Sequence, residues 1–227
     1  MADLKIFSFN PFGENTIILS GDDGQCVLID PGCYDEDERN TFYGHIGRNA
    51  LKPAAILLTH GHPDHIFGAA DAQRRFACPV YMNPEDRKLL EYDSEICGRL
   101  GLRQPDISFE TTDAVQNIPI AAAGFNFAVI ETPGHTDGGV CYYEKEQKLL
   151  FTGDTLFAGT IGRTDLKYGN YDSLIVSIMD KLMGLPGDID VLPGHGPCTT
   201  IADERTGNPM LEPFNEPEEY TGQEDGR

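Results

Sequence analysis

Short apolar segments recur along the chain, and most of them end in a cluster of polar residues. Segments such as "LKIFSF", "NTIILS" and "QCVLID" have the length and composition of β-strands, and "GDDG" between the last two is typical of a hairpin turn. The same pattern predicts strands at residues 4–9, 15–20, 25–30, 54–59, 79–82, 125–132, 139–144 and 147–154. A last strand, within 188–196, runs into a loop.

Helices are marked by a longer period and by capping signals. Residues 171–185 carry one apolar stripe, formed by Leu174, Ile178, Leu182 and Leu185. Residues 83–101 begin with Asn83 and Pro84 and end at Gly101, which are start and stop signals of a helix. Two more helices are predicted at 34–49 and 66–76. Because strands outnumber helices and hairpins join many of them, we predict two sheets packed together with helices outside, and not one doubly wound sheet.

Length, composition and charge bound the class of protein. A chain of 227 residues with 40% hydrophobic residues is long enough for one domain with a proper core. We predict that this domain covers residues 1–211 and that the acidic stretch 212–227 is a weakly ordered tail. The net charge is −20 and no basic face is visible, which argues against a nucleic-acid partner.

Cysteine usage and hydropathy indicate a cytoplasmic protein. The six cysteines are irregularly spaced and form no C-x-x-C pair, so we expect reduced thiols, with Cys26 and Cys141 in strand-like apolar runs. The first residues lack the apolar region of a secretory signal, and no apolar run has the length of a membrane span. The sequence therefore predicts neither export nor membrane association.

Five of the six histidines lie in polar loops that follow predicted strands. The positions of interest are His60, His62, Asp64 and His65 in "THGHPDH", followed by His135, Asp154 and His195 in three later loops. A single histidine is usually structural, but this many histidines and aspartates at strand ends indicate a metal site. Only His45, in a predicted surface helix, lies outside the pattern.

The number of candidate ligands fits two metal ions better than one. His60 and His62 are two positions apart in an extended stretch, so their imidazoles point to the same side. With His135 they form a three-imidazole site that leaves a position open for water. The remaining candidates are Asp64, His65 and His195 for a second ion, with Asp154 as the bridge. We therefore predict two divalent ions that activate a shared hydroxide, with zinc expected and iron or manganese as alternatives.

The motif "THGHPDH" resembles the H-x-H-x-D-H signature of the metallo-β-lactamase superfamily, and "PGH", "GD" and "PGH" follow in that family's order. The resemblance extends over nearly the whole chain, up to "NPML". It implies an α/β fold, a four-layer αβ/βα sandwich of two mixed sheets flanked by helices, with the metals at one edge of the paired sheets. It also implies the same two ligand sets, with Asp154 bridging.

Within the superfamily, "GDTLFAGTIGRTDL" and "LPGHGP" are similar to the glyoxalase II branch, the hydroxyacylglutathione hydrolases, and especially to its short bacterial members. This resemblance implies that a metal-bridging hydroxide attacks the carbonyl of a small-molecule thioester, which in that branch is linked to glutathione. Asp64 is a catalytic candidate, because it can steer the hydroxide proton. Two features depart from the branch. Only residues 196–227 follow His195 in place of a helical, glutathione-binding domain, and Pro197 stands where the branch has a glutathione-contacting tyrosine.

Candidates for substrate binding lie in the loop that follows Asp154. Arg163, in "IGRTD", is placed to bind a substrate carboxylate, and the alternative is that it braces the loop by pairing with Asp165. Lys167 and Tyr168 are further candidates of the same kind.

For several other residues near the candidate ligands, the sequence leaves two alternative roles open. Asp30 is either a partner of a ligand histidine or a turn residue. Threonines precede three of the ligand loops, at positions 59, 132 and 152, where they either orient ligands or simply suit strands. Cys198 is expected to be structural.

Other functions share parts of these motifs. The runner-up is an iron-dependent persulfide dioxygenase of the same superfamily, which has the H-x-H-x-D-H motif and a "GRTD" stretch. A β-lactamase is disfavoured by the lack of an export signal, and a nuclease by the lack of an inserted domain. A non-enzymatic scaffold that binds metal is disfavoured because all seven ligand positions are filled. The sequence predicts no oligomeric state.

Overall fold

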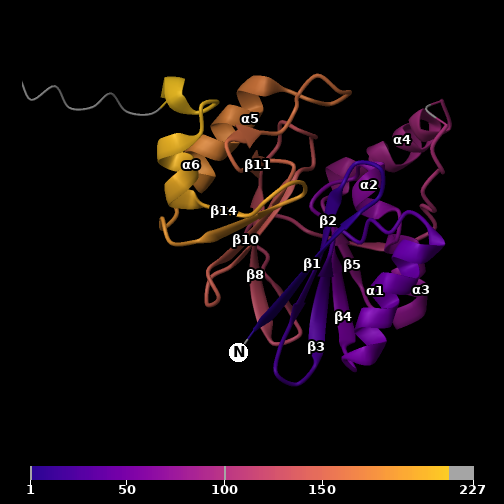
Figure 1. Ribbon diagram of the computed structural model, residues 1–227. Coiled ribbons are helices and arrows are strands. Elements are labelled where there is room, and N and C mark those ends of the chain that lie inside the picture. Colours follow the sequence, from indigo (N-terminus) through magenta and orange to yellow (C-terminus); the bar gives the residue numbers. More distant parts are fainter. Residues whose placement is uncertain (1, 100, 215–227) are drawn as a thin grey trace, which may run out of the picture.

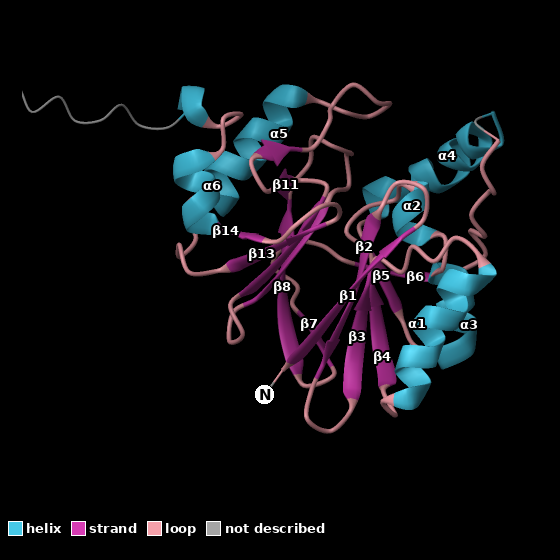
Figure 2. Ribbon diagram, viewed as in Figure 1, coloured by secondary structure: helices cyan, strands magenta, loops and turns pink. Residues whose placement is uncertain are grey.

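The computed structural model describes residues 2–99 and 101–214. Two six-stranded sheets lie face to face, and helices cover the outer face of each sheet (Figure 1). Figure 2 shows the resulting order of layers: helices, sheet, sheet, helices. The predicted four-layer αβ/βα sandwich is confirmed.

The first sheet is built from the N-terminal half in simple sequence order. Its strands are β1 (Asp3–Phe9), β2 (Glu14–Ser20), β3 (Gln25–Ile29), β4 (Lys52–Leu57), β5 (Val80–Met82) and β6 (Thr111–Asp113). The β1–β2 and β2–β3 pairs are antiparallel, whereas β3 to β6 run parallel. The helical segments of this half are α1 (Glu36–Arg48), α2 (Pro63–Ile66), α3 (Ala69–Phe76), the 3-10 turn η1 (Pro84–Asp86) and α4 (Arg87–Arg99).

The second sheet follows the order β14-β13-β10-β9-β8-β7. Its strands are β7 (Ile120–Ala122), β8 (Phe125–Glu131), β9 (Val140–Glu144), β10 (Leu149–Gly153), β13 (Asp190–Pro193) and β14 (Thr199–Thr200). A short ribbon, β11 (Leu156–Phe157) with β12 (Thr160–Ile161), stands beside it. The helical segments are α5 (Tyr171–Ser177), the π-helical turn η2 (Ile178–Leu182), α6 (Ile201–Gly207) and η3 (Glu212–Phe214).

Alternation along the central strands explains why they read as continuous apolar runs. Side chains of β2 point alternately to the two faces of the sheet. Ile17 and Leu19 therefore enter the core between the sheets, where Phe127 and Phe151 meet them from the other side. Ile18 points outward and packs with Phe42 of α1. Since both faces are covered, consecutive residues such as Ile17, Ile18 and Leu19 are all apolar.

The predicted helices are present, but three of them are interrupted. The segment predicted at 66–76 forms α2 and α3, the one at 83–101 forms η1 and α4, and the one at 171–185 forms α5 and η2. The predicted apolar stripe of the last segment is buried, at Leu174, Ile178 and Leu182. Strands β6, β7, β11, β12 and β14 and helix α6 were not predicted.

The predicted C-terminal tail lies only partly within the described residues. Of the predicted tail at 212–227, residues 212–214 form η3, and the rest lies outside the described residues. The boundary of the domain at 211 stays a prediction. Among the described residues, no helix combines the length and the apolar character needed to cross a membrane.

Candidate metal centre

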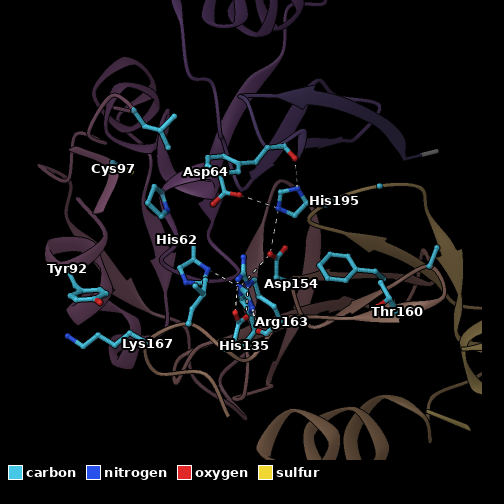
Figure 3. Close-up of a pocket in the computed structure, with 18 of the residues that line it drawn as sticks. His62, Asp64, Tyr92, Cys97, His135, Asp154, Thr160, Arg163, Lys167 and His195 are labelled. Carbon is cyan, nitrogen blue, oxygen red and sulfur yellow. Dashed lines mark hydrogen bonds and ion pairs between the residues drawn. The ribbon is translucent and has the colours of Figure 1, made fainter. Parts of the chain in front are cut away.

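The seven candidate ligands meet at one edge of the paired sheets, where four loops leave the carboxyl ends of β4, β8, β10 and β13. His60 and His62 follow β4, and Asp64 and His65 lie in α2 directly after them. The other three, His135, Asp154 and His195, follow β8, β10 and β13 of the second sheet. Figure 3 shows His62, Asp64, His135, Asp154 and His195 converging on one region of a cavity.

Three imidazoles form the first cluster, which consists of His60, His62 and His135. The ring centroids lie 4.8 Å (His60–His62), 4.9 Å (His60–His135) and 4.6 Å (His62–His135) apart. His135 Nε2 is 2.8 Å from His62 Nδ1, within hydrogen-bond distance. The cluster has the three-nitrogen arrangement of a catalytic zinc site.

The second cluster consists of Asp64, His65 and His195. Asp64 Oδ2 lies 3.3 Å from His195 Nε2 and 3.8 Å from His65 Nε2.

Asp154 stands between the two clusters. Its Oδ1 is 3.4 Å from His65 Nε2, and its Oδ2 is 3.5 Å from His135 Nε2. The carboxylate is thus within reach of both clusters, as expected for a bridge.

Buried polar atoms without partners show that this edge fits cations. His60 Nε2, His65 Nε2 and Asp154 Oδ1 are buried, and none of the described residues forms a hydrogen bond with them. Such atoms are costly to bury, and metal ions would satisfy all three. Imidazole and carboxylate ligands suit zinc, iron and manganese alike.

Two of the candidate ligand imidazoles, those of His135 and His195, are held by carbonyl oxygens through Nδ1. His135 Nδ1 lies 2.8 Å from the Arg163 carbonyl, and His195 Nδ1 lies 3.2 Å from the Phe12 carbonyl. Such contacts fix the tautomer, so that the Nε2 atom is free to coordinate.

Asp30 contacts two candidate ligands that follow β4: His65 directly, and His60 through the Thr59 hydroxyl. Its Oδ2 is 2.9 Å from His65 Nδ1 and accepts a 2.6 Å hydrogen bond from the Thr59 hydroxyl, which in turn is 3.0 Å from His60 Nδ1. Of the two roles considered for Asp30, the structure shows the contact with a ligand histidine.

The comparisons with known proteins agree with this geometry. The sequence model of the metallo-β-lactamase superfamily matches residues 9–195 of the chain. The chain belongs to this superfamily.

Relatives and solved structures match over almost the full length. Hydroxyacylglutathione hydrolase GloC from Haemophilus influenzae is 36% identical over 215 residues, which are 92% of this chain and 98% of that protein. The BLEG-1 B3 metallo-β-lactamase gives a TM-score of 0.84 with 35% identity, and the match covers 92% of this chain and 99% of that one. TTHA1623, solved in a di-iron-bound form, gives a TM-score of 0.81 with 34% identity over 91% of this chain and 100% of that one. Together with the ligand cluster, these matches identify a metal-dependent hydrolase of the superfamily.

Burial and charge divide the histidines of this superfamily site into two groups. Burial and the neighbouring histidines hold the pKa of His60 well below its usual value, and burial lowers the pKa of His62 to about 3. Burial also opposes a charge on His65, but the carboxylates of Asp154, Asp64 and Asp30 outweigh it and raise the pKa of His65 well above its usual value. His60 and His62 are therefore neutral, the form that ligates a metal.

Asp86 ties together two loops that carry ligands of the first cluster. Its Oδ2 accepts hydrogen bonds from Gly61 N (2.9 Å) and the Thr136 hydroxyl (2.7 Å), and its Oδ1 accepts one from Gly138 N (2.6 Å). Gly61 lies between His60 and His62, and Thr136 follows His135. Asp86 is fully buried, and burial raises the pKa of its carboxyl despite the three donors. Sequence reasoning missed this residue, because an acid in the first turn of a helix is ordinarily a surface residue.

The two sheets are joined by backbone hydrogen bonds at the same edge. Val140 N donates to Thr59 O (2.9 Å), and Asn15 N donates to Gly194 O (2.7 Å). Each bond lies next to a ligand loop, so the relative position of the two halves of the site is fixed by the main chain.

A cavity of about 870 Å³ opens beside the ligands. Five candidate ligands line it, namely His62, Asp64, His135, Asp154 and His195. Its apolar wall contains Phe12, Pro63, Leu102, Phe157, Leu166 and Pro197. The volume is in the range of small-molecule sites.

The predicted substrate-binding residues differ in their surroundings. Arg163 lines the cavity, but its guanidinium forms two 2.8 Å hydrogen bonds with the Asp165 carboxylate, the pairing considered as its alternative role. Lys167 also lines the cavity, and its Nζ lies 3.6 Å from the centre of the Tyr92 ring. Tyr168 does not line the cavity but contacts Lys167, with 4.8 Å between Nζ and the ring centre. Tyr92 was not predicted, since one aromatic residue in a helix gives no functional signal.

None of the six cysteines, all of which lie within the described residues, forms a disulfide, and Cys198 alone among them is exposed. Cys198 does not line the cavity. Burial raises the pKa of Cys26 to about 12 and that of Cys141 to about 11.

Proposed function

We propose that the chain is a glyoxalase II-like thioesterase that holds two divalent metal ions and hydrolyses a small-molecule thioester. One observation carries the proposal: the Asp154 carboxylate lies between two three-residue clusters of candidate ligands, beside a cavity large enough for such a substrate. Support for the substrate class comes from the relative named hydroxyacylglutathione hydrolase GloC. Zinc is the expected metal, and iron or manganese is the alternative.

The chain's own residues have distinct roles in this proposal. His60, His62 and His135 would hold one ion, and Asp64, His65 and His195 the other, with Asp154 shared. When bound, the two ions supply an activated water and polarise the thioester carbonyl. Asp64 lines the cavity, and in this proposal it would orient the proton of the attacking water. The thiol leaves as a thiolate, which is a good leaving group, so the site needs no separate acid.

Two residues that line the cavity bear on the chemical identity of the thiol that the substrate releases. Pro197 lines the cavity and presents no hydroxyl, and the paired Arg163 offers no spare charge. We therefore propose a thioester substrate for which glutathione is one candidate thiol and not the required one.

The test combines metal analysis with parallel assays. As-purified and zinc-loaded protein would be analysed for metal and assayed for hydrolysis of S-lactoylglutathione, for oxygen uptake with glutathione persulfide and for hydrolysis of a chromogenic β-lactam. Two ions per chain with thioester hydrolysis would support the proposal. One iron with oxygen uptake would replace it by a persulfide dioxygenase, and β-lactam turnover alone by the activity named for BLEG-1.

A further inference from the structure

Among the described residues of the cavity, one cation has no carboxylate partner. Arg163 and Lys167 are the lysine and arginine residues of the described wall. Arg163 is neutralised by Asp165 through two hydrogen bonds. No carboxylate in the described part of the chain lies within ion-pair distance of Lys167. The remaining acids of the wall, Asp64 and Asp154, belong to the ligand clusters.

Within the part of the chain that the structure describes, Lys167 is held in place by aromatic rings and not by a carboxylate. Its Nζ lies 3.6 Å from the centre of the Tyr92 ring and 4.8 Å from that of Tyr168. A cation–π contact positions an ammonium group but leaves its charge and its hydrogen-bond donors available. Because the contact restricts a flexible side chain beforehand, less conformational entropy is lost when an anion binds.

The net charge of the chain increases the importance of a local cation. A protein of net charge −20 repels anions at long range, so an anionic group that lies away from the two ligand clusters benefits from a positive contact of its own. One such contact matches one carboxylate. A substrate with several uncompensated anionic groups would leave the others without a partner in the described wall.

The end of the cavity away from Lys167 is apolar and aromatic. Figure 3 shows Lys167 and Tyr92 on one side of the ligand residues and Thr160 on the other. Next to His195 the wall is aromatic, because the Phe157 ring centre lies 6.3 Å from that of His195 and Phe12 is 50% exposed. The ligands thus lie between a cationic end and an apolar end.

We propose that Lys167, seated on Tyr92, recognises a substrate carboxylate, so that the enzyme prefers thioesters with one carboxylate at one end and an apolar group at the other. This inference rests on the thioesterase function proposed above and names the substrate class for it. Lys167 is a specificity-determining residue, whereas Arg163 braces the loop.

The experiment compares two ligands that differ in one charge. The substrates are the hexanoyl thioester of 3-mercaptopropionate and that of 3-mercaptopropionamide, assayed with zinc-loaded enzyme. The matching thioethers, 3-(hexylthio)propanoate and its amide, serve as non-hydrolysable ligands for calorimetry. The variants are Lys167→Met, which removes the charge, Lys167→Arg, which keeps it, and Tyr92→Leu, which removes the aromatic support. Lys148→Met, at an exposed pair with Asp188, controls for the change in net charge.

The expected result is a preference for the carboxylate, mainly in KM, of roughly tenfold, the scale of one hydrogen bond to a charged group. The preference disappears in Lys167→Met, shrinks in Tyr92→Leu, and survives in Lys167→Arg and Lys148→Met. It also weakens as salt concentration rises.

Two kinds of failure are distinguishable. If neither thioester is hydrolysed but the carboxylate thioether binds more tightly in a Lys167-dependent manner, the thioesterase proposal fails and the recognition by Lys167 stands. If wild type shows equal constants for carboxylate and amide in both assays, or if Lys167→Met keeps the preference, the recognition by Lys167 is wrong.

Discussion

Replacing Asp86 tests whether the first ligand cluster depends on a residue that touches no ligand side chain. Its carboxylate accepts hydrogen bonds from Gly61 N, Gly138 N and the Thr136 hydroxyl. The change Asp86→Asn keeps the shape of the side chain but turns one oxygen into an amide NH2 group. The best orientation keeps the remaining oxygen on Gly61 and Thr136, so the NH2 group faces Gly138 N, a donor 2.6 Å from Oδ1 in wild type.

The magnitude follows from the donors that lose their acceptor. A hydrogen bond to a charged group contributes about 1.5–3 kcal/mol, so Asp86→Asn should lower the free energy of unfolding by roughly 2–3 kcal/mol. Asp86→Ala leaves three buried donors unpaired and should cost roughly 4–6 kcal/mol, which is comparable with the whole stability of many domains. Asp86→Asn is therefore the variant expected to remain folded.

The assay measures stability and metal affinity separately. Denaturant unfolding of the chelated protein gives the first quantity, and competition with a chromophoric zinc chelator gives the second. Because Gly61 lies between His60 and His62, we expect Asp86→Asn to weaken zinc binding about 10–100-fold, as for other residues that position ligands. Asp113→Asn is the control, since it removes only an exposed pair with Arg87 and should change neither quantity by more than about 1 kcal/mol.

Two results would refute this reasoning. Zinc affinity equal to wild type in a destabilised Asp86→Asn protein would restrict Asp86 to a role in the fold. Stability equal to that of Asp113→Asn would mean that the hydrogen bond from Gly138 N and the charge of the Asp86 carboxylate contribute nothing measurable.

Three further predictions concern the ligands, a glycine and the thiols. His60→Ala should reduce thioester hydrolysis to the rate of the chelated enzyme while His45→Ala, at the histidine outside the cluster, keeps full activity; unchanged turnover in His60→Ala would contradict the metal mechanism. A β-carbon at Gly194 would overlap Asp154 Oδ1 and lie 2.6 Å from His65 Cε1, so Gly194→Ala should lower the metal content from two ions to one, whereas Gly184→Ala, with no atom within 4 Å, should not. Alkylation followed by mass spectrometry should label one thiol in the native protein, at Cys198, and six after unfolding. Partial burial raises the pKa of Cys198, so its labelling should accelerate as the pH rises above neutrality, and early labelling of a second thiol would contradict the burial pattern.

The layers of the fold could be predicted because both faces of the central strands are covered. Strands β2 and β10 are buried at every position, and each contains a run of three consecutive apolar residues that is visible without knowledge of their partners. The short strands β11, β12 and β14 have two residues each, too few to show any period. Their pairing depends on neighbours that are distant in sequence.

The candidate ligands could be predicted because metal chemistry restricts the residue types and strand ends restrict their positions. The structure brings all seven together, while their roles as ligands stay a prediction. The supporting residues could not be predicted in the same way. Asp86 and Tyr92 are ordinary helix residues in sequence, and only the folded chain places one against the ligand loops and the other under Lys167.

The division of the ligands between the two sheets has a consequence for biosynthesis. His60 and His62 emerge from the ribosome well before His135, and Asp64 and His65 precede His195 by more than half of the chain. A nascent N-terminal half thus presents only two donors to each ion, below the three that a zinc site requires. We expect metal capture to be a late event, which follows completion of the polypeptide and docking of the halves, so that incomplete chains do not compete with finished enzyme for scarce metal.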